Sequence, residues 1–425
     1  MPIEFSLSDE PFNTQYAPLG VLLALYQQKQ VLQPLEQVVA PEKKVLFSTH
    51  DKLKQVLVSI LAGCDTLSEV NTKLQGDQPL AQAGGWVAFA DQSTLSLTLD
   101  ALTLMNLTQL QHCLRQLLRL HGDTGSHDWR GFLWLDYDLS GLPCSKRSEG
   151  SQKGYFSQKN STGRQLARVS AAQHQETIWS GLFPGNAHTV NCFPTALQSA
   201  QDSLELDSKQ RQRTVWRFDG GGGSEANFRL LLAQGYHLHA KGLSSSRAAA
   251  LAKQATRWDA YHDKWVAEVP PPFDLGRPVR VFVQRRLHQG QFLHNYFVST
   301  LTFPAKSHFL SYYDARGGAE VAQFREDKSG LALAIRRKRA FAGQLAYILL
   351  TDLAHNLVAD FKHHGLSGSP FAHYGIKRII RDLFCLPGSL LFADQQLVRV
   401  TLPTLKQNSH DLLFCLEKYC SERFS

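Results

Sequence analysis

Three acidic residues stand where an apolar run passes into a polar loop. Asp136 and Asp138 follow the aromatic run 132–135, and Asp219 directly follows a second short apolar run, 214–218. Both runs predict buried strands. A carboxylate at the edge of a buried strand is costly unless it is paired, solvated or bound to a cation. Aspartate after a strand also commonly starts a turn or caps a helix, so this ordinary explanation stays open for each residue alone.

Four glycines, Gly220 to Gly223, come directly after Asp219. They do not form a Walker motif, because no Lys-Ser/Thr pair follows them. A dinucleotide fingerprint would need a helix opening directly from the loop and an acid about 20 residues further on. We interpret these glycines as residues that let the backbone pass closely around Asp219 and leave room for a metal ion and DNA.

A third acid belongs to the segment 313–320 (YDARGGAE), which is followed by Asp327 and Lys328. On a helix, Tyr313, Arg316 and Glu320 would share one face. This face is either a solvated, salt-bridged stripe or part of a site. In a site, Glu320 would complete a carboxylate cluster, Arg316 would bind a phosphate through two hydrogen bonds, and Tyr313 would contact the DNA backbone or stack on a base.

The elements that must position these residues form a mixed α/β pattern. Residues 1–125 are predicted to be mainly helical, with helices over 45–61 and 107–120, and the polar break 122–128 ends this region. The region 126–243 is predicted to alternate strands at 132–135, 166–172, 176–182, 214–218 and 236–240 with helices at 189–203 and 225–234. The stretch 145–164 between the first two strands is polar and rich in Lys, Ser, Gly and Gln.

The second half of the chain changes character twice. Residues 244–309 are predicted to be a β-rich insertion, with a hairpin of strands 279–287 and 292–301 joined through 288–291. Residues 310–365 are predicted to be helical, with the strongest periodicity in 341–361. Residues 366–425 add short strands such as 397–402 and a last helix at 410–422.

The composition narrows the classes of function. The chain of 425 residues has a net charge of +8, which is compatible with a polyanionic partner. Its seven cysteines contain no C-x-x-C pair, so a zinc ribbon is not indicated and a reduced, cytoplasmic setting is expected. The apolar segment 345–358 is interrupted by Asp352 and His355, so we expect a buried helix and no membrane span.

The order and spacing of six stretches resemble the DDE transposases of bacterial insertion sequences. Asp138 and Asp219 are 81 residues apart, and Asp219 and Glu320 are 101 apart, which leaves room for an insertion. The matching stretches, within residues 130–385, are LDYDLSG at 135–141, EGSQKGYF at 149–156, LFPGN at 182–186, RFDGGGGSE at 217–225, YYDARGGAE at 312–320 and LLTDLAHNLVADFK at 349–362. Lys328 comes one residue later than in the family's third motif, and Ser140 follows Asp138 as the family's Thr or Ser does, which favours Asp138 over Asp136.

The resemblance implies an RNase H-like core with a β-rich insertion, joined to a helical N-terminal domain. It implies that Asp138, Asp219 and Glu320, with Asp136 as an alternative first ligand, hold two Mg²⁺ or Mn²⁺ ions, with Asp138 bridging both. Water would cut one strand at each element end, and the freed 3′-hydroxyl would attack the opposite strand or the target.

The partners implied are the terminal inverted repeats of the element and the target DNA, bound by a homodimer in the bacterial cytoplasm at the nucleoid. Residues 1–125 would recognise the DNA ends, and 366–425 would contact DNA or dimerise. The expected phosphate contacts, besides Tyr313, Arg316 and Lys328, are Arg336, Arg337, Lys338, Arg339, Lys377, Arg378 and Arg381. Trp258 and Trp265 are either core residues or platforms for an unpaired base.

Two other functions remain open at this stage. A metal-dependent nuclease that cuts without joining would share the same acids. A DNA-binding protein descended from a transposase would lack activity, although the presence of all three acids argues against decay of the site.

Overall fold

The computed structural model describes residues 3–8, 11–40, 46–156, 159–316, 322–404 and 408–423. The chain divides into two compact units, which are described separately below. Unit 1 comprises Met1–Gly125, Arg147–Glu149 and Arg325–Ser425, and unit 2 comprises Ser126–Lys146 and Gly150–Phe324. The C-terminal hundred residues therefore group with the N-terminal region, and the finer five-part division expected from the sequence stays a prediction.

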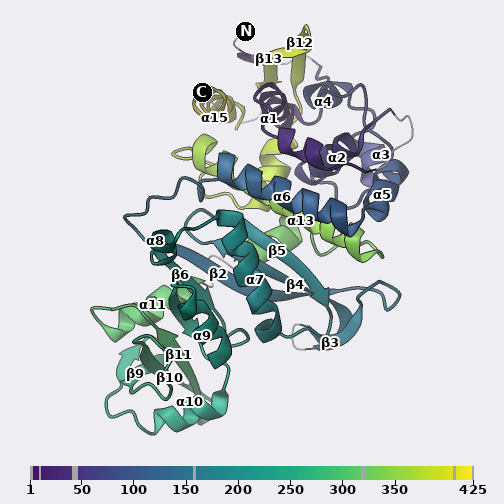
Figure 1. Ribbon diagram of the computed structural model, residues 1–425. Helices are drawn as coiled ribbons and strands as arrows, with labels where there is room; N and C mark the ends of the chain where they lie inside the picture. The colour runs from purple at the N-terminus through teal and green to yellow at the C-terminus, as the bar shows by residue number, and fades with distance from the viewer. Residues whose placement is uncertain are drawn as a thin grey trace. The chain divides into compact units, whose positions relative to one another are not determined.

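Unit 1 is built around helix α13 (Phe341–Asp360), which is buried along most of its length and contacts α2 (Thr49–Leu61), α5 (Gln92–Ala101) and α6 (Leu104–His121) (Figure 1). Most of its residues are buried and most of its side chains are apolar, and this confirms the buried helix predicted there. A small sheet in the order β1 (Glu4–Ser8), β13 (Gln396–Pro403) and β12 (Ser389–Ala393) completes the unit.

The other helices of unit 1 are short or peripheral. They are α1 (Ala17–Gln28), η1 (Gln33–Gln37), α3 (Glu69–Lys73), α4 (Gln78–Ala83), η3 (Phe361–Gly365), α14 (Ile376–Arg378), η4 (Ile379–Phe384) and α15 (Ser409–Glu422). Helix α12 (Ala322–Gly330) begins in unit 2 and continues into unit 1. Among the described residues, no helix combines the length and the apolar character needed to cross a bilayer.

The centre of unit 2 is a five-stranded arrangement in the order β5-β4-β2-β6-β7. The strands β2 (Leu133–Pro143), β4 (Lys159–Ala171) and β5 (Glu176–Pro184) are antiparallel, whereas β6 (Thr214–Phe218) and β7 (His237–Lys241) run parallel to β2. Helices α7 (Thr189–Leu204), α8 (Ser208–Arg211) and α9 (Glu225–Ala233) connect the later strands. This strand order and these directions are those of the RNase H-like fold, so the expected fold class is confirmed.

The polar stretch 145–164 contains strands that the sequence did not predict. They are β3 (Gln152–Phe156) and the start of β4, which pair with each other. Their side chains are mostly polar, so the sequence lacks the alternation of apolar and polar residues that predicts a strand. The backbone of β3 also lies very close to the turn that follows β5, because a Cβ at Gly154 would lie 2.0 Å from the carbonyl oxygen of Gly185. The stretches EGSQKGYF and LFPGN therefore meet through these two glycines.

The β-rich insertion extends the core sheet. Strands β8 (Asp259–Tyr261), β9 (Lys264–Val269), β10 (Arg280–His288) and β11 (Gln291–Ser299) follow β7 in the order β7-β11-β10-β9-β8. The predicted hairpin is confirmed, with Gln289 and Gly290 at positive φ in its turn, as a two-residue primed turn requires. Because β11 pairs with β7, residues of the core and of the insertion share one continuous sheet face.

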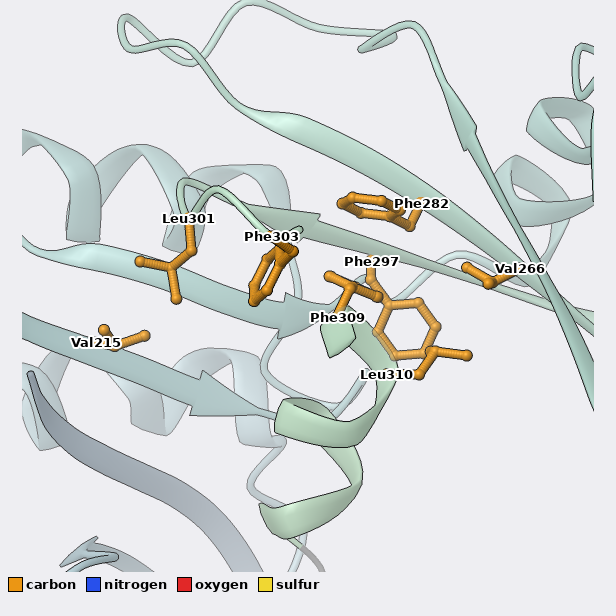
Figure 2. Close-up of a cluster of buried hydrophobic side chains, with 8 residues drawn as sticks. All are labelled: Val215, Val266, Phe282, Phe297, Leu301, Phe303, Phe309 and Leu310. Carbon is orange, nitrogen blue, oxygen red and sulfur yellow. The ribbon is translucent and has the colours of Figure 1, made fainter. Parts of the chain in front are cut away.

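Helix α11 (Lys306–Arg316) lies on this face of unit 2, whereas α10 (Ser245–Ala252) packs against the insertion strands. Figure 2 shows Phe309 and Leu310 of α11 beside side chains of the insertion strands, in a cluster that also includes Val215 of β6. The buried cluster comprises Val215, Val266, Phe282, Phe297, Leu301, Phe303, Phe309 and Leu310. These contacts hold the helix that carries Tyr313 and Arg316 against the sheet.

Candidate active site

Asp138 and Asp219 lie side by side at the sheet edge of unit 2. Their preceding residues, Tyr137 and Phe218, are paired in the parallel register of β2 and β6, so the two acids are the next residues on adjacent strands. Adjacent strands are about 4.8 Å apart, and both aspartates are partly exposed. The sequence placed Asp138 at a strand end, but β2 continues to Pro143 because β4 pairs with it along its other edge.

The buried phenol of Tyr137 lies close to both acids. Burial is the main cause that raises its pKa, and the charges of Cys192, Asp138 and Asp219 raise it further. Its hydroxyl donates a hydrogen bond to the carbonyl oxygen of Thr189, 2.9 Å away.

The glycines after Asp219 allow the chain to fold closely around it. The amide of Gly221 donates a hydrogen bond to Oδ1 of Asp219 at 2.8 Å. A Cβ at Gly223 would lie 1.9 Å from the carbonyl oxygen of Lys241. This confirms the close backbone passage that we inferred for the glycine run, and the space it would leave for metal and DNA stays a prediction.

Asp136 forms a buried ion pair with Arg217 of β6. The Nε and Nη2 atoms of Arg217 donate to the two carboxylate oxygens at 2.6 and 2.8 Å, and Nη1 donates to the carbonyl oxygen of Tyr312 at 2.7 Å. Burial raises the pKa of Asp136, and the charge of Arg217 opposes this rise. Both oxygens of Asp136 are therefore engaged by Arg217, and the choice between Asp136 and Asp138 as the first metal ligand stays a prediction.

Arg217 is a positioning residue that the sequence analysis missed. It precedes Asp219 by two residues, as Asp136 precedes Asp138, so strand alternation brings the first pair onto the face of the second. Its contact with Tyr312 also ties α11 to the sheet, and its guanidinium lies over the ring of Trp134 at 4.9 Å. This shared two-residue spacing is the sequence signal that could have identified Arg217.

Tyr313 and Arg316 share one face of α11, as predicted, with the Arg316 guanidinium 5.5 Å from the centre of the Tyr313 ring. Tyr313 packs edge to face against Phe297 of β11. The charge of Arg316 also acts to lower the pKa of Asp136, so this cation lies on the acid-bearing side of the sheet. Glu320, the expected third ligand, lies outside the described residues, and its role stays a prediction.

Lys241 ends β7 next to Asp219 and was also missed. The register of β6 and β7 pairs Trp216 with Leu238, so three residues later Asp219 and Lys241 occupy the same level. Burial is the main cause that lowers the pKa of Lys241, the carboxylate of Asp219 opposes this, and the cations Arg316, Arg286 and Lys264 lower it further. Acids and cations therefore meet at one edge of unit 2.

The basic run 336–339 does not form one continuous exposed surface, because two of its four side chains are buried. Arg336 is buried and donates to the carbonyl oxygens of Ser59 and Cys64 at the end of α2. Lys338 is buried and forms an ion pair with Asp100 at 2.7 Å. Neither side chain reaches the surface, whereas Arg337 and Arg339 are exposed.

The other expected DNA contacts keep surface positions or pack on neighbours. Lys377 and Arg378 are exposed, Arg378 and Arg381 pair with Asp382, and Lys328 is partly buried on α12. Trp258 and Trp265 enclose the guanidinium of Arg285 together with Phe292, with ring centres 4.3, 5.5 and 4.7 Å from its central carbon. This partly exposed packing accounts for both tryptophans, and their contact with DNA stays a prediction.

A second group of metal-ligating side chains lies in unit 1. Asp123, Asp360 and His364 each offer a ligand atom within 4.8 Å of one another. However, Asp360 accepts hydrogen bonds from Arg423 and Tyr419, and Asp123 is bonded to His363 and His364 at 3.0 and 2.8 Å. These partners tie together the ends of α6, α13 and α15, so the group serves as a structural clamp.

Unit 2 thus defines a protein of the RNase H-like class with two acids on its central parallel strands. No protein-family model and no curated protein matches the chain. Among solved structures, the chain is similar to a piggyBac transposase in a synaptic complex with hairpin DNA, solved by cryo-EM. The TM-score is 0.49 with 11% identity, over 87% of this chain and 79% of that chain. At this level the likeness concerns the path of the chain, and it assigns no residue or activity.

Proposed function

We propose that this protein is a DDE-type DNA transposase that binds the terminal inverted repeats of its element, cuts DNA and joins the freed ends to a target. The observation that carries the proposal is the placement of Asp138 and Asp219 at the same level of adjacent parallel strands in an RNase H-like sheet. Tyr313 and Arg316 on α11, directly before the segment with Glu320, support it.

The chemistry of the donors fits divalent cations. Carboxylates on neighbouring strands repel each other unless a cation lies nearby, and Mg²⁺ or Mn²⁺ prefers oxygen ligands. Asp138 and Asp219 would hold the ions, with Glu320 as the third ligand. When bound, two such ions activate the attacking oxygen and stabilise the leaving oxygen.

The chain itself positions the substrate. Arg316 lies on the side of the acids, where it would bind the phosphate group with two parallel hydrogen bonds. Tyr313 is held by Phe297 and Arg316, so its hydroxyl can meet the DNA backbone at a set position. The Asp136–Arg217 pair keeps β2, β6 and α11 together and so keeps the acids in line.

The test uses the full chain and a mini-element made from the DNA that flanks its reading frame. Asp219→Asn and Glu320→Gln are expected to lose nicking and strand transfer by about 10³-fold or more in Mg²⁺, while binding in EDTA is unchanged. The control is Asp274→Asn, an exposed loop residue of unit 2 that should keep full activity. Unchanged nicking by both site variants would refute the proposal.

Pre-cut ends separate joining from cutting. A transposase joins such ends to target DNA, and the same acid variants abolish the joining. A wild-type protein that nicks but never joins would instead be a metal-dependent nuclease with the same site.

A further inference from the structure

The acid-bearing face of the sheet continues onto the insertion. Lys241 is paired with Phe297 of β11, Phe297 with Phe282 of β10, and Phe282 with Glu268 of β9. Directly paired residues share a face, and every second residue along a strand returns to it. Arg286 of β10 and Lys264 of β9 therefore lie on the same face as Lys241 and Asp219.

Charges on this face are balanced at one end and unbalanced at the other. Near the base of β9 and β10, Arg280 donates two hydrogen bonds to Glu268, both 2.8 Å long. Towards the tip, Arg286 is paired directly with Lys264, so two cations stand opposite each other. Asp314 lies 3.5 Å from Lys264 and offsets one of these charges. Like charges directly opposite each other on paired strands destabilise the fold. A bound anion between Arg286 and Lys264 would relieve this repulsion.

The two neighbouring arginines of β10 have different environments. Arg285 points to the opposite face, where Trp258, Trp265 and Phe292 surround its guanidinium. Arg286 is exposed on the acid-bearing face, and its charge, with that of Lys264, acts on Lys241. The cations on the acid-bearing face therefore form a group that reaches from the acids to the hairpin.

We propose that Lys241, Lys264 and Arg286, here called the cationic row, bind successive phosphates of a DNA strand that passes from the acids onto the insertion. The inference rests on the proposed function for its substrate and assigns a further binding surface to it. Phe282 of β10 lies at the level of Lys241, because both are paired through Phe297. Arg286 lies four residues further along β10, a length of about 13 Å. A DNA strand carries one phosphate per about 3.4 Å of helix axis, so the row is long enough for several phosphates.

The first experiment measures DNA binding by the full chain in EDTA, with a labelled duplex of unrelated sequence as the probe. Lys264→Gln combined with Arg286→Gln is compared with Lys209→Gln combined with Lys253→Gln, which removes the same charge from exposed positions. Lys253 follows α10, which packs on the opposite face through Arg247 and Tyr296. The row variant should reduce the slope of log K against log salt by about 1.8, because two phosphate contacts are lost. An unchanged slope, or an equal reduction of the slope in the control variant, would contradict the proposal that the cationic row binds DNA.

The second experiment separates binding from folding. Arg286→Gln removes the cross-strand repulsion and leaves the Lys264–Asp314 pair intact, so its melting temperature should equal or exceed that of the wild type. A lower melting temperature would show that Arg286 is a structural residue and would overturn its assignment. Because both measurements omit metal, they do not depend on cleavage. A Lys264→Gln and Arg286→Gln variant with unchanged DNA binding would contradict the cationic row. An Asp219→Asn variant that still nicks DNA would instead contradict the proposed function, so the two failures are distinguishable.

Discussion

The two units use their charged side chains in different ways. In unit 1, Asp360 is bonded to Arg423 and Tyr419, Asp123 to two histidines, and Lys338 to Asp100. In unit 2, Arg217 pairs with Asp136, and the next level of the same strands carries the partly exposed Asp138 and Asp219.

The number of neighbouring acids therefore does not by itself define a metal site. The ligand atoms of Asp123, Asp360 and His364 lie within 4.8 Å of one another, and Arg423 supplies a counter-charge within the fold. The acids of unit 2 also have cations beside them, since Asp138 is paired in register with the buried Arg168 and Asp219 lies next to Lys241. What distinguishes these acids is their place on adjacent parallel strands of the RNase H-like sheet.

The largest expected effect compares one acid from each unit. Asp138→Asn should reduce DNA cleavage in Mg²⁺ by about 10³-fold or more, because it removes a proposed metal ligand. Asp123→Asn should leave cleavage unchanged at neutral pH and lower the melting temperature. The opposite pattern, with cleavage lost only in Asp123→Asn, would move the site to unit 1.

The next effect concerns the buried pairs. Arg217→Met should cost about 3–5 kcal/mol in the free energy of unfolding, because it leaves Asp136 buried without its partner. Adding Asp136→Asn to that variant should recover part of the loss. Arg423→Met should cost less, since Asp360 keeps its bond to Tyr419. Denaturant titrations measure all three, and equal costs for both arginines would contradict the contrast.

The basic run offers a matched pair within unit 1. Arg336→Met should cost about 2–3 kcal/mol, because the carbonyl groups of Ser59 and Cys64 lose their donor, with no change in the salt slope of DNA binding. Arg337→Met should stay within about 0.5 kcal/mol of the wild type, since its side chain is exposed. If Arg336→Met alone changed the salt slope, its assignment to the interior would be wrong.

The last comparison concerns a pH dependence in unit 2, which is small near neutral pH and grows as the pH falls. Burial lowers the pKa of His239 to about 3, whereas an unfolded histidine has a pKa of about 6.5. The unfolded state therefore takes up a proton first as the pH falls. Stability is fully present above about pH 6.5 and is lost by about 1.4 kcal/mol per pH unit below it, until the pH reaches the folded pKa.

Tryptophan fluorescence during denaturation reports this loss, since every tryptophan except Trp86 lies in unit 2. His239→Gln should show a shallower pH slope than the wild type between pH 4 and about 6.5. Identical slopes would contradict the prediction. The lowered pKa of Asp123, caused chiefly by its bond to His363, acts in unit 1 only below about pH 4, the range of an unfolded aspartate.

The sequence by itself predicted the elements whose burial is periodic. Strand β6 spans the predicted residues, and α9, the insertion hairpin and α13 differ from prediction by one or two residues at their ends. Local hydrophobic patterning carries this information because each element buries one face or all of it. The acids Asp138 and Asp219 were likewise readable from their places after apolar runs.

Only the tertiary structure decided which charged residues are already paired. Asp136 and Asp138 have equivalent neighbours in the sequence, and Arg217, which engages Asp136, is 81 residues away. The alternation of buried and exposed residues in 336–339 and the cross-strand pairing of Arg286 with Lys264 were equally hidden. Charge pairing and strand register are set by contacts between distant segments, so composition and spacing along the chain do not encode them locally.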